Sequence, residues 1–485
     1  MNETLLRIYH HLPAAARSLA ASMRGAYLRA WRYGPETERL VEEALARESW
    51  SPEKWKTWQE ERLAQVLHRG AMRVPYYRQQ WAERRRKGDR ASWEYLENWP
   101  VLGKEPVRRN PRAFIADDCE PRKMLRVQTS GTTGTPLQLW HSRRTLRAWY
   151  ALFEARWRRW YGISRHDRWA ILGGQLVTPV RQQRPPFWVW NSALRQLYLS
   201  SYHLAPDLVA DYLDALVRYR VVYLLGYTSA LFALAYETLR LGRGDVRPRV
   251  VITNAEPVYD YQREVIVRAF QCPVRETYGM AEMAAAAGEC ERGSLHLWPE
   301  AGIVEVLEGG EPVARGQSGE LVCTGLVNLD MPLIRYRVGD RGTLPAEDTG
   351  CPCGRLLPTI QSVEGRLDDV LYTRDGRRVG RLDPVFKADV PIQEAQIIQE
   401  SLERVRVLYV PAAGCGEDTA QIIRQRLKDR LGEMEIEVQP VASIPRGANG
   451  KFRAVVCRLA PEDLRSQDPR QQPVEEHEVR AGSRP

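Results

Sequence analysis

The segment Thr129-Ser130-Gly131-Thr132-Thr133-Gly134-Thr135-Pro136 decides how the rest of the chain is interpreted. It follows the apolar pair Leu125 and Val127. Its two glycines allow a tight turn with backbone N–H groups facing inward, and its hydroxyls can donate hydrogen bonds to phosphate oxygens. It lacks the Gly-Lys-Ser/Thr ending of a Walker loop. Taken alone, the segment predicts an oxyanion-binding loop, with an ordinary surface loop as the alternative.

The length and composition of the chain indicate an enzyme-sized globular protein. Its 485 residues include 44% hydrophobic and 27% charged residues, which excludes a disordered or low-complexity chain. Eight cysteines are too few for a disulfide scaffold. Arg7, Arg17 and Arg24 interrupt the apolar N-terminal residues, so a signal-peptide core or a membrane span is not expected there. We therefore expect a cytoplasmic protein.

Basic residues are concentrated near the N-terminus. The net charge is +10, and residues 1–95 hold 18 basic against 12 acidic residues, including the run Arg84-Arg85-Arg86-Lys87. A solvated helix face is the favoured interpretation of this run, and no zinc-finger or RNP signature accompanies it, so no nucleic-acid partner is expected. The stretch Leu5 to Trp31 is either a membrane-surface segment or, as we favour, a helical segment packed on the body of the protein.

Apolar spacing and turn residues divide the chain into four regions. Residues 1–95 have helical spacing and predict a helical N-terminal region packed on the large domain. Residues 96–367 contain short apolar runs followed by helical patterns, and then strand-rich sequence, which predicts an α/β core with a small β subdomain. Residues 368–461 predict a compact α+β C-terminal domain, and residues 462–485 a disordered tail.

Particular elements are expected in each region. Strands are predicted at Trp169–Leu172, Val221–Leu225, Val250–Thr253, Ile303–Leu307, Gly319–Thr324, Leu333–Tyr336, Val405–Val410, Glu435–Val441 and Arg453–Arg458, and a helix at Thr419–Leu431. Ligands of open α/β sheets usually bind at the carboxyl ends of the strands, so the site is expected there.

Further motifs follow the first loop along the chain, and together they carry a family resemblance. They are Asn254-Ala255-Glu256-Pro257, Glu276-Thr277-Tyr278-Gly279-Met280-Ala281-Glu282, Tyr336-Arg337-Val338-Gly339-Asp340, Gly365-Arg366 and Pro445-Arg446-Gly447-Ala448-Asn449-Gly450-Lys451. The set resembles the adenylate-forming superfamily of acyl-CoA ligases, from about Pro75 to Arg453. Cys351-Pro352-Cys353-Gly354-Arg355 and Gly226-Tyr227-Thr228-Ser229 favour the phenylacetate-CoA ligase-like branch, and the segment from Gly376 to Pro384 resembles homologues of capsule and exopolysaccharide biosynthesis.

This resemblance implies a fold and an activity. The large N-terminal adenylate-forming domain would carry a small mobile C-terminal domain. The enzyme would activate a carboxylic acid with ATP and Mg²⁺ to an acyl-adenylate, release pyrophosphate, and transfer the acyl group to coenzyme A. Because the region after Asp369 departs from the phenylacetate enzymes, an amine, a hydroxyl or a carrier-protein thiol is the alternative acceptor, for example on a polysaccharide precursor.

The resemblance also implies roles for individual residues. Thr129, Ser130, Gly131, Thr132, Thr133 and Gly134 would hold the β- and γ-phosphates of ATP. Tyr278 and the loop from Asn254 to Pro257 would flank the adenine, so Ala255, Glu256 and Pro257 would bind the nucleotide together with Thr277, Tyr278 and Gly279. Asp340 would accept hydrogen bonds from the ribose hydroxyls, Arg366 would contact ribose or phosphate, Glu282 would help to hold Mg²⁺, and Lys451 would contact the carboxylate and the α-phosphate. Retention of Lys451, Glu282 and Asp340 argues against a degenerate, non-enzymatic homologue.

The acid-binding pocket is not named by any motif. By position, Tyr202 and Tyr227 are candidates for its lining together with Trp149, Trp188 and Trp190, with His203 near the carboxylate; ordinary core packing is the alternative for these aromatic residues.

Cys290-x5-His296 and Cys351-x-Cys353 supply four ligands of the kind that a tetrahedral Zn²⁺ prefers. The two pairs are far apart in the sequence, and their spacing is not that of a standard zinc finger. Either they form a structural zinc site, or they are two unrelated loops with free thiols.

Overall fold

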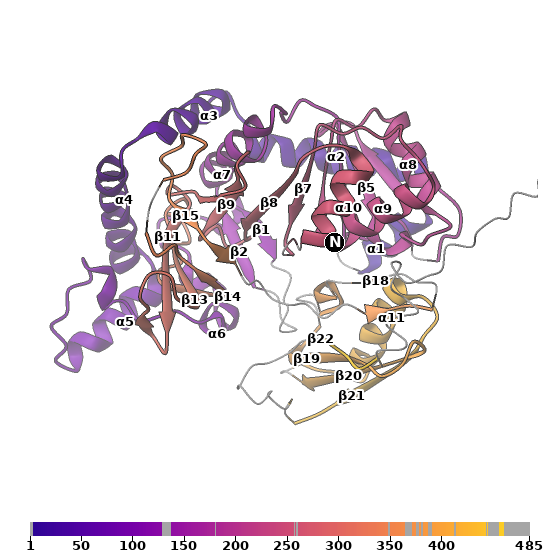
Figure 1. Ribbon diagram of the computed structural model, residues 1–485. Coiled ribbons are helices and arrows are strands. Elements are labelled where there is room, and N and C mark those ends of the chain that lie inside the picture. Colours follow the sequence, from indigo (N-terminus) through magenta and orange to yellow (C-terminus); the bar gives the residue numbers. More distant parts are fainter. Residues whose placement is uncertain are drawn as a thin grey trace, which may run out of the picture.

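The computed structural model describes residues 3–128, 137–179, 181–256, 258, 260–347, 350–363, 371–374, 378–379, 382–386, 390–411, 414–442, 444 and 455–459. These residues form a large α/β domain and a separate, smaller C-terminal domain, which lies below the large domain in Figure 1. The predicted fold class is confirmed. The predicted boundary at residue 368 and the predicted tail lie outside the described residues.

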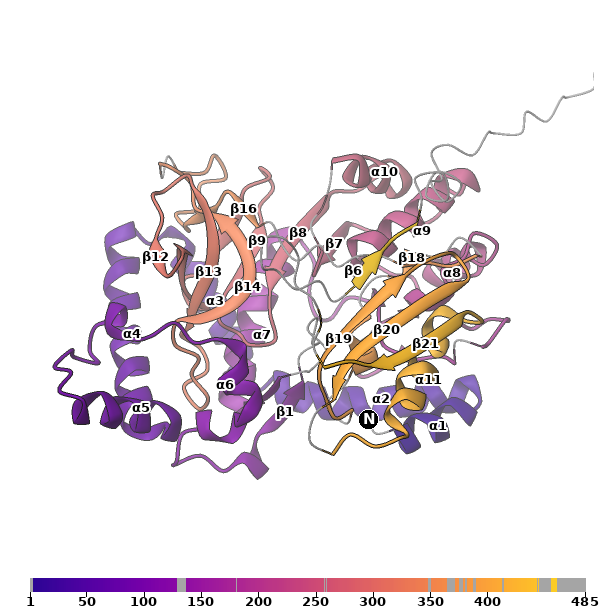
Figure 2. The same cartoon turned by 90° about the horizontal axis from the view of Figure 1, so that it is seen from below.

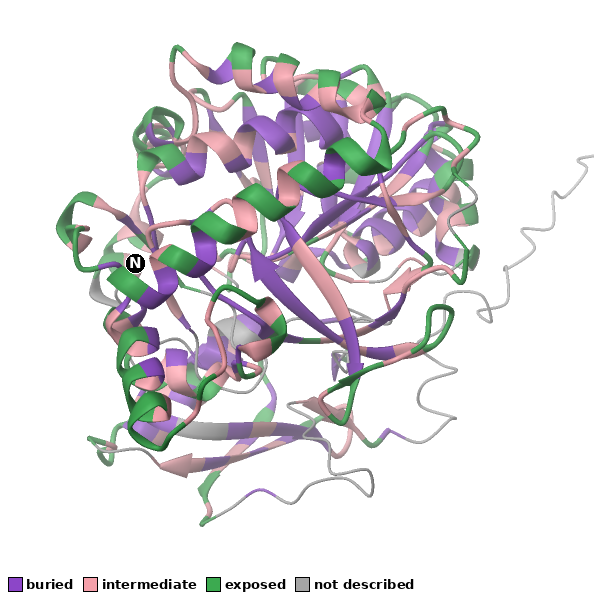
Figure 3. Cartoon of the chain, turned by 90° about the vertical axis from the view of Figure 1, so that its left-hand side faces the viewer, coloured by how far each residue is buried: buried purple, intermediate pink, exposed green. Residues whose placement is uncertain are grey.

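The N-terminal region is helical, as the apolar spacing predicts. Its helices are α1 (Glu3–His11), α2 (Ala14–Arg32), α3 (Thr37–Ala46), α4 (Pro52–Arg73), α5 (Pro75–Arg86) and the short α6 (Lys104–Arg109). The Ser51 side chain accepts a hydrogen bond from the Lys54 N–H and Pro52 occupies the first turn, which fixes where α4 begins. Figure 3 shows buried and exposed residues alternating around the helices on the left-hand side of Figure 1, as expected for helices with one face against the body of the protein.

A nine-stranded sheet forms the centre of the large domain. Its strands are β3 (Trp169–Gly173), β4 (Trp188–Asn191), β5 (Gln196–Ser200), β6 (Tyr223–Tyr227), β7 (Val250–Asn254), β8 (Val274–Gly279), β9 (Ala286–Glu289), β10 (Leu295–Leu297) and β15 (Thr359–Ile360). Their order is β15-β10-β9-β8-β7-β6-β3-β5-β4, and β8, β7, β6, β3 and β5 are parallel. This parallel core places the carboxyl ends of the strands, and the loops after them, along one edge.

Helices cover both faces of this sheet. They are α7 (Arg143–Trp157), α8 (Val209–Arg218), α9 (Thr228–Arg240) and α10 (Asp260–Phe270). Buried residues of α8, α9 and α10 pack with β3, β5, β6 and β7 in one core, and α7 packs with α2 and α3 in another. Burial on both faces explains why β3, β6 and β7 read as continuous apolar runs in the sequence.

A five-stranded antiparallel sheet is the predicted β subdomain. Its strands are β11 (Gly302–Glu308), β12 (Glu311–Pro312), β13 (Ser318–Gly325), β14 (Tyr336–Thr343) and β16 (Ser362–Val363), and a separate hairpin comprises β1 (Leu125–Gln128) and β2 (Gln138–His141). The prediction of a strand over Leu333–Tyr336 is wrong, because β14 begins only at Tyr336. Arg335 has a φ of 45°, in the left-handed region, and this interrupts the extended path.

Within the described residues, the C-terminal domain has a four-stranded sheet in the order β21-β20-β19-β22, a separate β17–β18 hairpin and one α-helix. Its elements are β17 (Leu371–Tyr372), β18 (Arg378–Val379), β19 (Ile392–Gln399), β20 (Arg404–Pro411), α11 (Thr419–Leu431), β21 (Glu435–Pro440) and β22 (Val455–Cys457). Figures 1 and 2 both place this domain next to α1. Tyr202 of the large domain belongs to the core cluster of the C-terminal domain. The two domains therefore share a packed contact.

All eight cysteines are free thiols. Among the described helices, none combines the length and apolar character needed to cross a membrane.

Candidate functional site

Two motif carboxylates lie where the nine-stranded sheet meets the five-stranded sheet. Tyr278, at the end of β8, donates a hydrogen bond from its hydroxyl to Oδ2 of Asp340 on β14, at 2.9 Å. Tyr336, the first residue of β14, donates to Oε1 of Glu282 at 3.1 Å. Burial and the Asp340 carboxylate raise the pKa of the Tyr278 hydroxyl well above its usual value, so this hydroxyl is a donor at neutral pH. The structure therefore brings three predicted site residues to one junction.

The loop after β7 is held against the neighbouring strand ends. Ala255 has a φ of 68°, a left-handed conformation that is uncommon for alanine. The hydroxyl of Thr277 donates to the Thr253 carbonyl at 2.7 Å, and the hydroxyl of Thr228 donates to the Glu256 carbonyl at 3.1 Å. These two bonds tie the predicted adenine-flanking segments to β7 and to the start of α9.

A buried acceptor without a partner lies at the last residue of β7, directly before this loop. The side-chain Oδ1 of Asn254 is buried and has no hydrogen-bond donor among the described residues. Buried acceptors are normally paired, so this oxygen suits a donor supplied by a ligand.

Glu276 adds an unusual carboxyl group to β8. Burial, with a smaller contribution from the Glu289 carboxylate, raises its pKa from 4.5 to about 7. Glu289 itself is paired with Arg263 at 2.9 Å and also accepts the Glu276 backbone N–H at 2.7 Å. Glu276 is therefore largely protonated below neutral pH, beside the motif residues Thr277 and Tyr278.

Several predicted site residues fall outside the described part of the chain. They are Thr129, Ser130, Gly131, Thr132, Thr133, Gly134, Pro257, Arg366 and Lys451. Their convergence on the junction of Asp340 and Glu282 stays a prediction.

The three residues predicted for the acid pocket lie at the ends of β5 and β6. The Tyr202 hydroxyl donates to the Gly174 carbonyl at 2.7 Å. A Cβ atom on Gly174 would lie 3.2 Å from the Tyr202 hydroxyl and 3.3 Å from the Tyr227 hydroxyl, so both hydroxyls converge on this glycine. His203 is buried, stacks on Phe187 with ring centroids 4.9 Å apart, and its Nδ1 lies 2.8 Å from the Ser200 hydroxyl.

The tryptophans predicted as further lining are found in packed surroundings. Trp149 lies in the core formed by α2, α3 and α7, with its ring centroid 6.1 Å from that of Trp298. Trp190, on the edge strand β4, stacks on Tyr219 at 5.0 Å. Trp188 packs on the core under α8.

The predicted metal ligands come together near β9, β10 and β15, at the β15 edge of the nine-stranded sheet. The ligand atoms of Cys290, His296, Cys351 and Cys353 all lie within 4.8 Å of one another. Antiparallel pairing of β9 with β10 brings Cys290 near His296, and pairing of β10 with β15 brings in the segment that carries the other two cysteines. Two unrelated loops, the alternative left open by the sequence, are therefore excluded.

Distances within this cluster match a tetrahedral site. The sulfurs of Cys290 and Cys351 are 3.7 Å apart, and the Cys353 sulfur is 3.4 Å from Nε2 of His296. Zinc bonds of about 2.3 Å to sulfur and about 2.0 Å to nitrogen give tetrahedral edges of about 3.8 and 3.5 Å. Nδ1 of His296 lies 3.0 Å from the Leu357 carbonyl, an arrangement that leaves Nε2 facing the sulfurs. The donor set fits a zinc ion.

Comparisons with known proteins place this geometry in a family. Residues 371–458 match the family model described as the CapK C-terminal domain. Protein CapK of Staphylococcus aureus is 23% identical over 466 residues, which cover 93% of this chain and 99% of that protein. The phenylacetate-coenzyme A ligase of Pseudomonas putida is 27% identical over 328 residues, covering 65% of this chain and 71% of that enzyme. The chain belongs to the adenylate-forming ligase superfamily. Within it, the chain falls in the CapK and phenylacetate-CoA ligase-like branch.

A solved structure shows the same fold. It is the structure of 2-hydroxyisobutyryl-CoA ligase in complex with 2-HIB-AMP and CoA, in the thioesterification state. The two structures align with a TM-score of 0.54 and 20% sequence identity, over 85% of this chain and 91% of that one.

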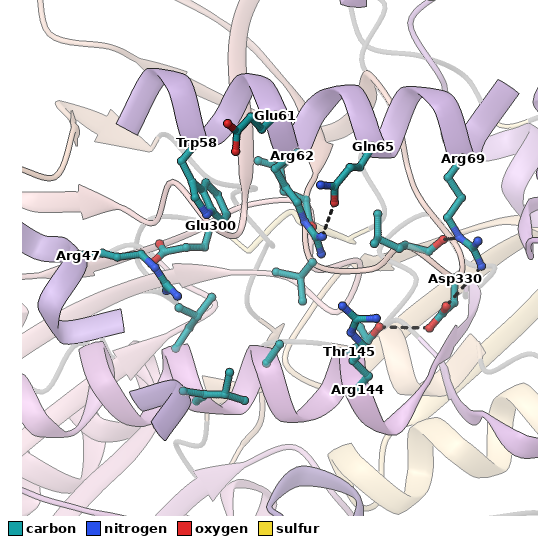
Figure 4. A pocket seen from close by; sticks show the side chains of 17 residues that line it. Arg47, Trp58, Glu61, Arg62, Gln65, Arg69, Arg144, Thr145, Glu300 and Asp330 are labelled. Carbon is teal, nitrogen blue, oxygen red and sulfur yellow. Dashed lines mark hydrogen bonds and ion pairs between the residues drawn. The ribbon is translucent and has the colours of Figure 1, made fainter. Parts of the chain in front are cut away.

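A cavity of about 410 Å³ in this adenylate-forming ligase lies away from the motif residues, between α4 and α7 (Figure 4). Arg62 and Arg144 point into it from opposite helices. Arg47 pairs with Glu300 at 3.3 Å, and Arg69 lies 3.8 Å from Asp330. None of the residues predicted for the acid pocket lines this cavity.

Sequence reasoning missed the partners of the site residues. It quoted Tyr336 as part of a motif but gave it no role, and it did not identify the Asn254 acceptor or the Glu276 carboxyl. A tyrosine four residues before the motif carboxylate Asp340 was the only available signal for the first of these.

Proposed function

We propose that this adenylate-forming ligase couples a carboxylic acid to AMP, with release of pyrophosphate, and then transfers the acyl group to coenzyme A. The observation that carries the proposal is the pairing of Asp340 with Tyr278 and of Glu282 with Tyr336 at one junction. These contacts hold both carboxylates in fixed positions beside the strand ends where a nucleotide would bind. A carboxylate such as Asp340 can accept hydrogen bonds from both ribose hydroxyls.

Other residues support the nucleotide part of the proposal. The unpaired Oδ1 of Asn254 suits the amino group of adenine, and the left-handed Ala255 turns the chain beside it. Glu282 would hold Mg²⁺, which supplies positive charge for the phosphates. Lys451 would neutralise charge on the acid and on the α-phosphate, and its removal by rotation of the C-terminal domain would open the site for the second half-reaction.

The acceptor rests on the relatives. Coenzyme A is favoured because similar chains are named phenylacetate-coenzyme A ligases. Protein CapK matches almost the whole chain, and its name states no acceptor. An amine, a hydroxyl or a carrier-protein thiol is therefore kept as the second candidate.

The test uses a panel of carboxylic acids and acid-dependent exchange of pyrophosphate into ATP. We expect exchange with at least one acid, its abolition in Lys451→Ala, and largely unchanged nucleotide binding in that variant. Unchanged exchange would remove Lys451 from the mechanism, and exchange with none of a broad panel would contradict adenylation. AMP release with coenzyme A, and separately with an amine, a hydroxyl or a carrier-protein thiol, then distinguishes the acceptors.

We also propose that Cys290, His296, Cys351 and Cys353 bind one structural zinc ion. The support is the tetrahedral spacing of four ligand atoms that two pairs of strands bring together. With four protein ligands, the metal would have no position for substrate, so its role would be to join the β9–β10 hairpin to the segment before β15. Metal analysis of the purified protein, with Cys351→Ser as the comparison, tests this.

A further inference from the structure

An apolar stripe runs along the outer side of the two N-terminal helices. On α2 the exposed residues include Ala15, Leu19, Met23, Ala26, Tyr27 and Ala30, which recur at the three- and four-residue spacing of one helix face. Leu19 and Met23 are 63% and 68% exposed, and on α1 Leu5 and Ile8 are 54% and 56% exposed. Single exposed apolar residues are ordinary, but a group of them on two successive helices indicates a binding surface.

The opposite face of α2 fixes the helix to the large domain. Arg17, Gly25 and Trp31 are buried. A Cβ atom on Gly25 would lie 2.0 Å from Oδ1 of Asn191, so the helix backbone lies directly against β4. The Trp190 backbone N–H donates to the Ser18 hydroxyl at 3.2 Å. The sequence-based preference for packing on the body therefore describes only one face, while the other remains exposed.

The surroundings of the stripe are basic. Residues 4–35 contain five arginines and no aspartate or glutamate. Beside the C-terminal half of α2 lies a cavity of about 240 Å³, and none of its lining residues is acidic. They are Arg29, Arg32, Tyr33, Arg158, Arg165, His166, Trp169, Ser192, Ala193, Leu194 and Arg195. We refer to this cavity as the basic pocket.

The basic pocket carries unbalanced positive charge. Arg158 and Arg165 have carboxylate partners, since Arg158 pairs with Glu154 at 3.0 Å and Arg165 pairs with Glu38. In the described part of the chain, Arg29, Arg32 and Arg195 form no ion pair with a carboxylate. This distinguishes the basic pocket from the cavity of Figure 4, which is also lined by Glu61, Glu300 and Asp330.

The pocket and the stripe meet on the same helix. An adjoining hollow shares Arg29, Arg165 and His166 with the basic pocket and is also lined by Ala26 and Ala30, which belong to the exposed stripe. A phospholipid surface presents anionic phosphate groups beside acyl chains, which matches a basic pocket beside an apolar stripe. In Figure 2, α1 and α2 lie along one side of the molecule.

We propose that α1 and α2 dock this enzyme on an anionic phospholipid membrane, with the apolar stripe in the interface and a lipid phosphate in the basic pocket. Docking would hold the whole enzyme, including the junction of Asp340 and Glu282, at the membrane surface. An acid or an acceptor that carries a lipid chain would then be accessible to the enzyme.

The experiment is co-sedimentation of the full-length protein with vesicles. One set contains phosphatidylcholine alone and the other contains added phosphatidylglycerol, at low and at physiological salt. We expect binding only to the anionic vesicles, weakened by salt. Leu19→Glu/Met23→Glu should lower the partition coefficient about tenfold or more, as should Arg29→Gln/Arg32→Gln. The matched controls Val217→Glu/Leu241→Glu and Arg122→Gln/Lys123→Gln, which change exposed residues elsewhere, should bind like the wild type.

Three results would overturn the proposal. The first is no binding to anionic vesicles at low salt, and the second is binding that the α2 variants leave unchanged. The third is a dimer in sedimentation that Leu19→Glu/Met23→Glu converts to a monomer, since the stripe would then be a protein interface. Titration with inorganic phosphate distinguishes a free anion from a lipid headgroup as the ligand of the basic pocket. Phosphate binding without vesicle binding would assign the pocket to a free anion. Pyrophosphate exchange measured on the same variants should equal the wild-type value, which keeps this test independent of the adenylation proposal.

Discussion

The hydroxyl of Tyr336 donates a hydrogen bond to the carboxylate of Glu282 across 54 residues of sequence. Tyr336 begins β14 of the five-stranded sheet, whereas Glu282 lies in the loop between β8 and β9 of the nine-stranded sheet. The bond therefore connects the two sheets at the proposed magnesium ligand. Tyr336 is fully buried, so its orientation is fixed by packing.

Loss of this hydrogen bond should weaken the binding of Mg²⁺. Partners that orient a metal ligand typically contribute about tenfold or more to metal affinity. In Tyr336→Phe we expect the Mg²⁺ concentration for half-maximal pyrophosphate exchange to rise by roughly that factor, with a smaller change at saturating Mg²⁺. Tyr212→Phe removes a buried hydroxyl that donates to the Ser200 carbonyl at 2.7 Å, and it serves as the control. Equal effects in both variants would show that Tyr336 is merely structural.

The pair Tyr278 and Asp340 gives a second prediction. Asp340→Asn retains the shape of the side chain but loses the charge, so the ribose hydroxyls would lose a strong acceptor. We expect the KM for ATP to rise about tenfold or more in Asp340→Asn and less in Tyr278→Phe, where the carboxylate remains. The KM for the carboxylic acid should change little in either variant. A change confined to the KM for the acid would place Asp340 in the acid pocket instead of beside the nucleotide.

Strong local patterns predicted the fold well. The apolar runs that became β3, β6 and β7 are buried on both faces, and the helix predicted at Thr419–Leu431 has the same bounds in the structure. The strand β19 (Ile392–Gln399) was missed, because its sequence is rich in Gln and Glu. It is a strand because β20 and β22 pair with it on both sides. Such pairing is a tertiary effect and leaves no local signal.

The candidate site was predicted through its motifs and not through its contacts. The resemblance identified Tyr278, Glu282 and Asp340, and the structure brings them to one junction. The raised pKa of Glu276 depends on burial and on Glu289 in the next strand, which no spacing of residues reveals. The metal cluster was predictable only in part. The sequence shows the four candidate ligands, but their proximity depends on the pairing of β10 with β9 and β15.

The proposed zinc ion should stabilise the large domain. Cys353→Ser removes one of the four ligands and leaves the donor set incomplete, so we expect the bound zinc to fall well below one equivalent. The free energy of unfolding should decrease by roughly 2–4 kcal/mol. Cys415→Ser, which changes a half-buried thiol in the C-terminal domain, is the matched control. A wild-type protein without zinc, whose stability a chelator does not change, would contradict the zinc site.

The carboxyl group of Glu276 should make the stability of the protein depend on pH between about 4.5 and 7. Burial and Glu289 raise its pKa to about 7 in the folded protein, while the unfolded chain keeps the ordinary value of 4.5. In this range the folded state holds more protons than the unfolded state, so the free energy of unfolding falls as the pH rises and levels off above about 7. A shift of this size corresponds to about 3 kcal/mol from this group. Glu276→Gln should remove that decrease in urea unfolding measured at pH 4.5, 6 and 8, relative to Glu264→Gln on the exposed side of α10. The same slope in both variants would show that Glu276 ionises normally in the folded protein.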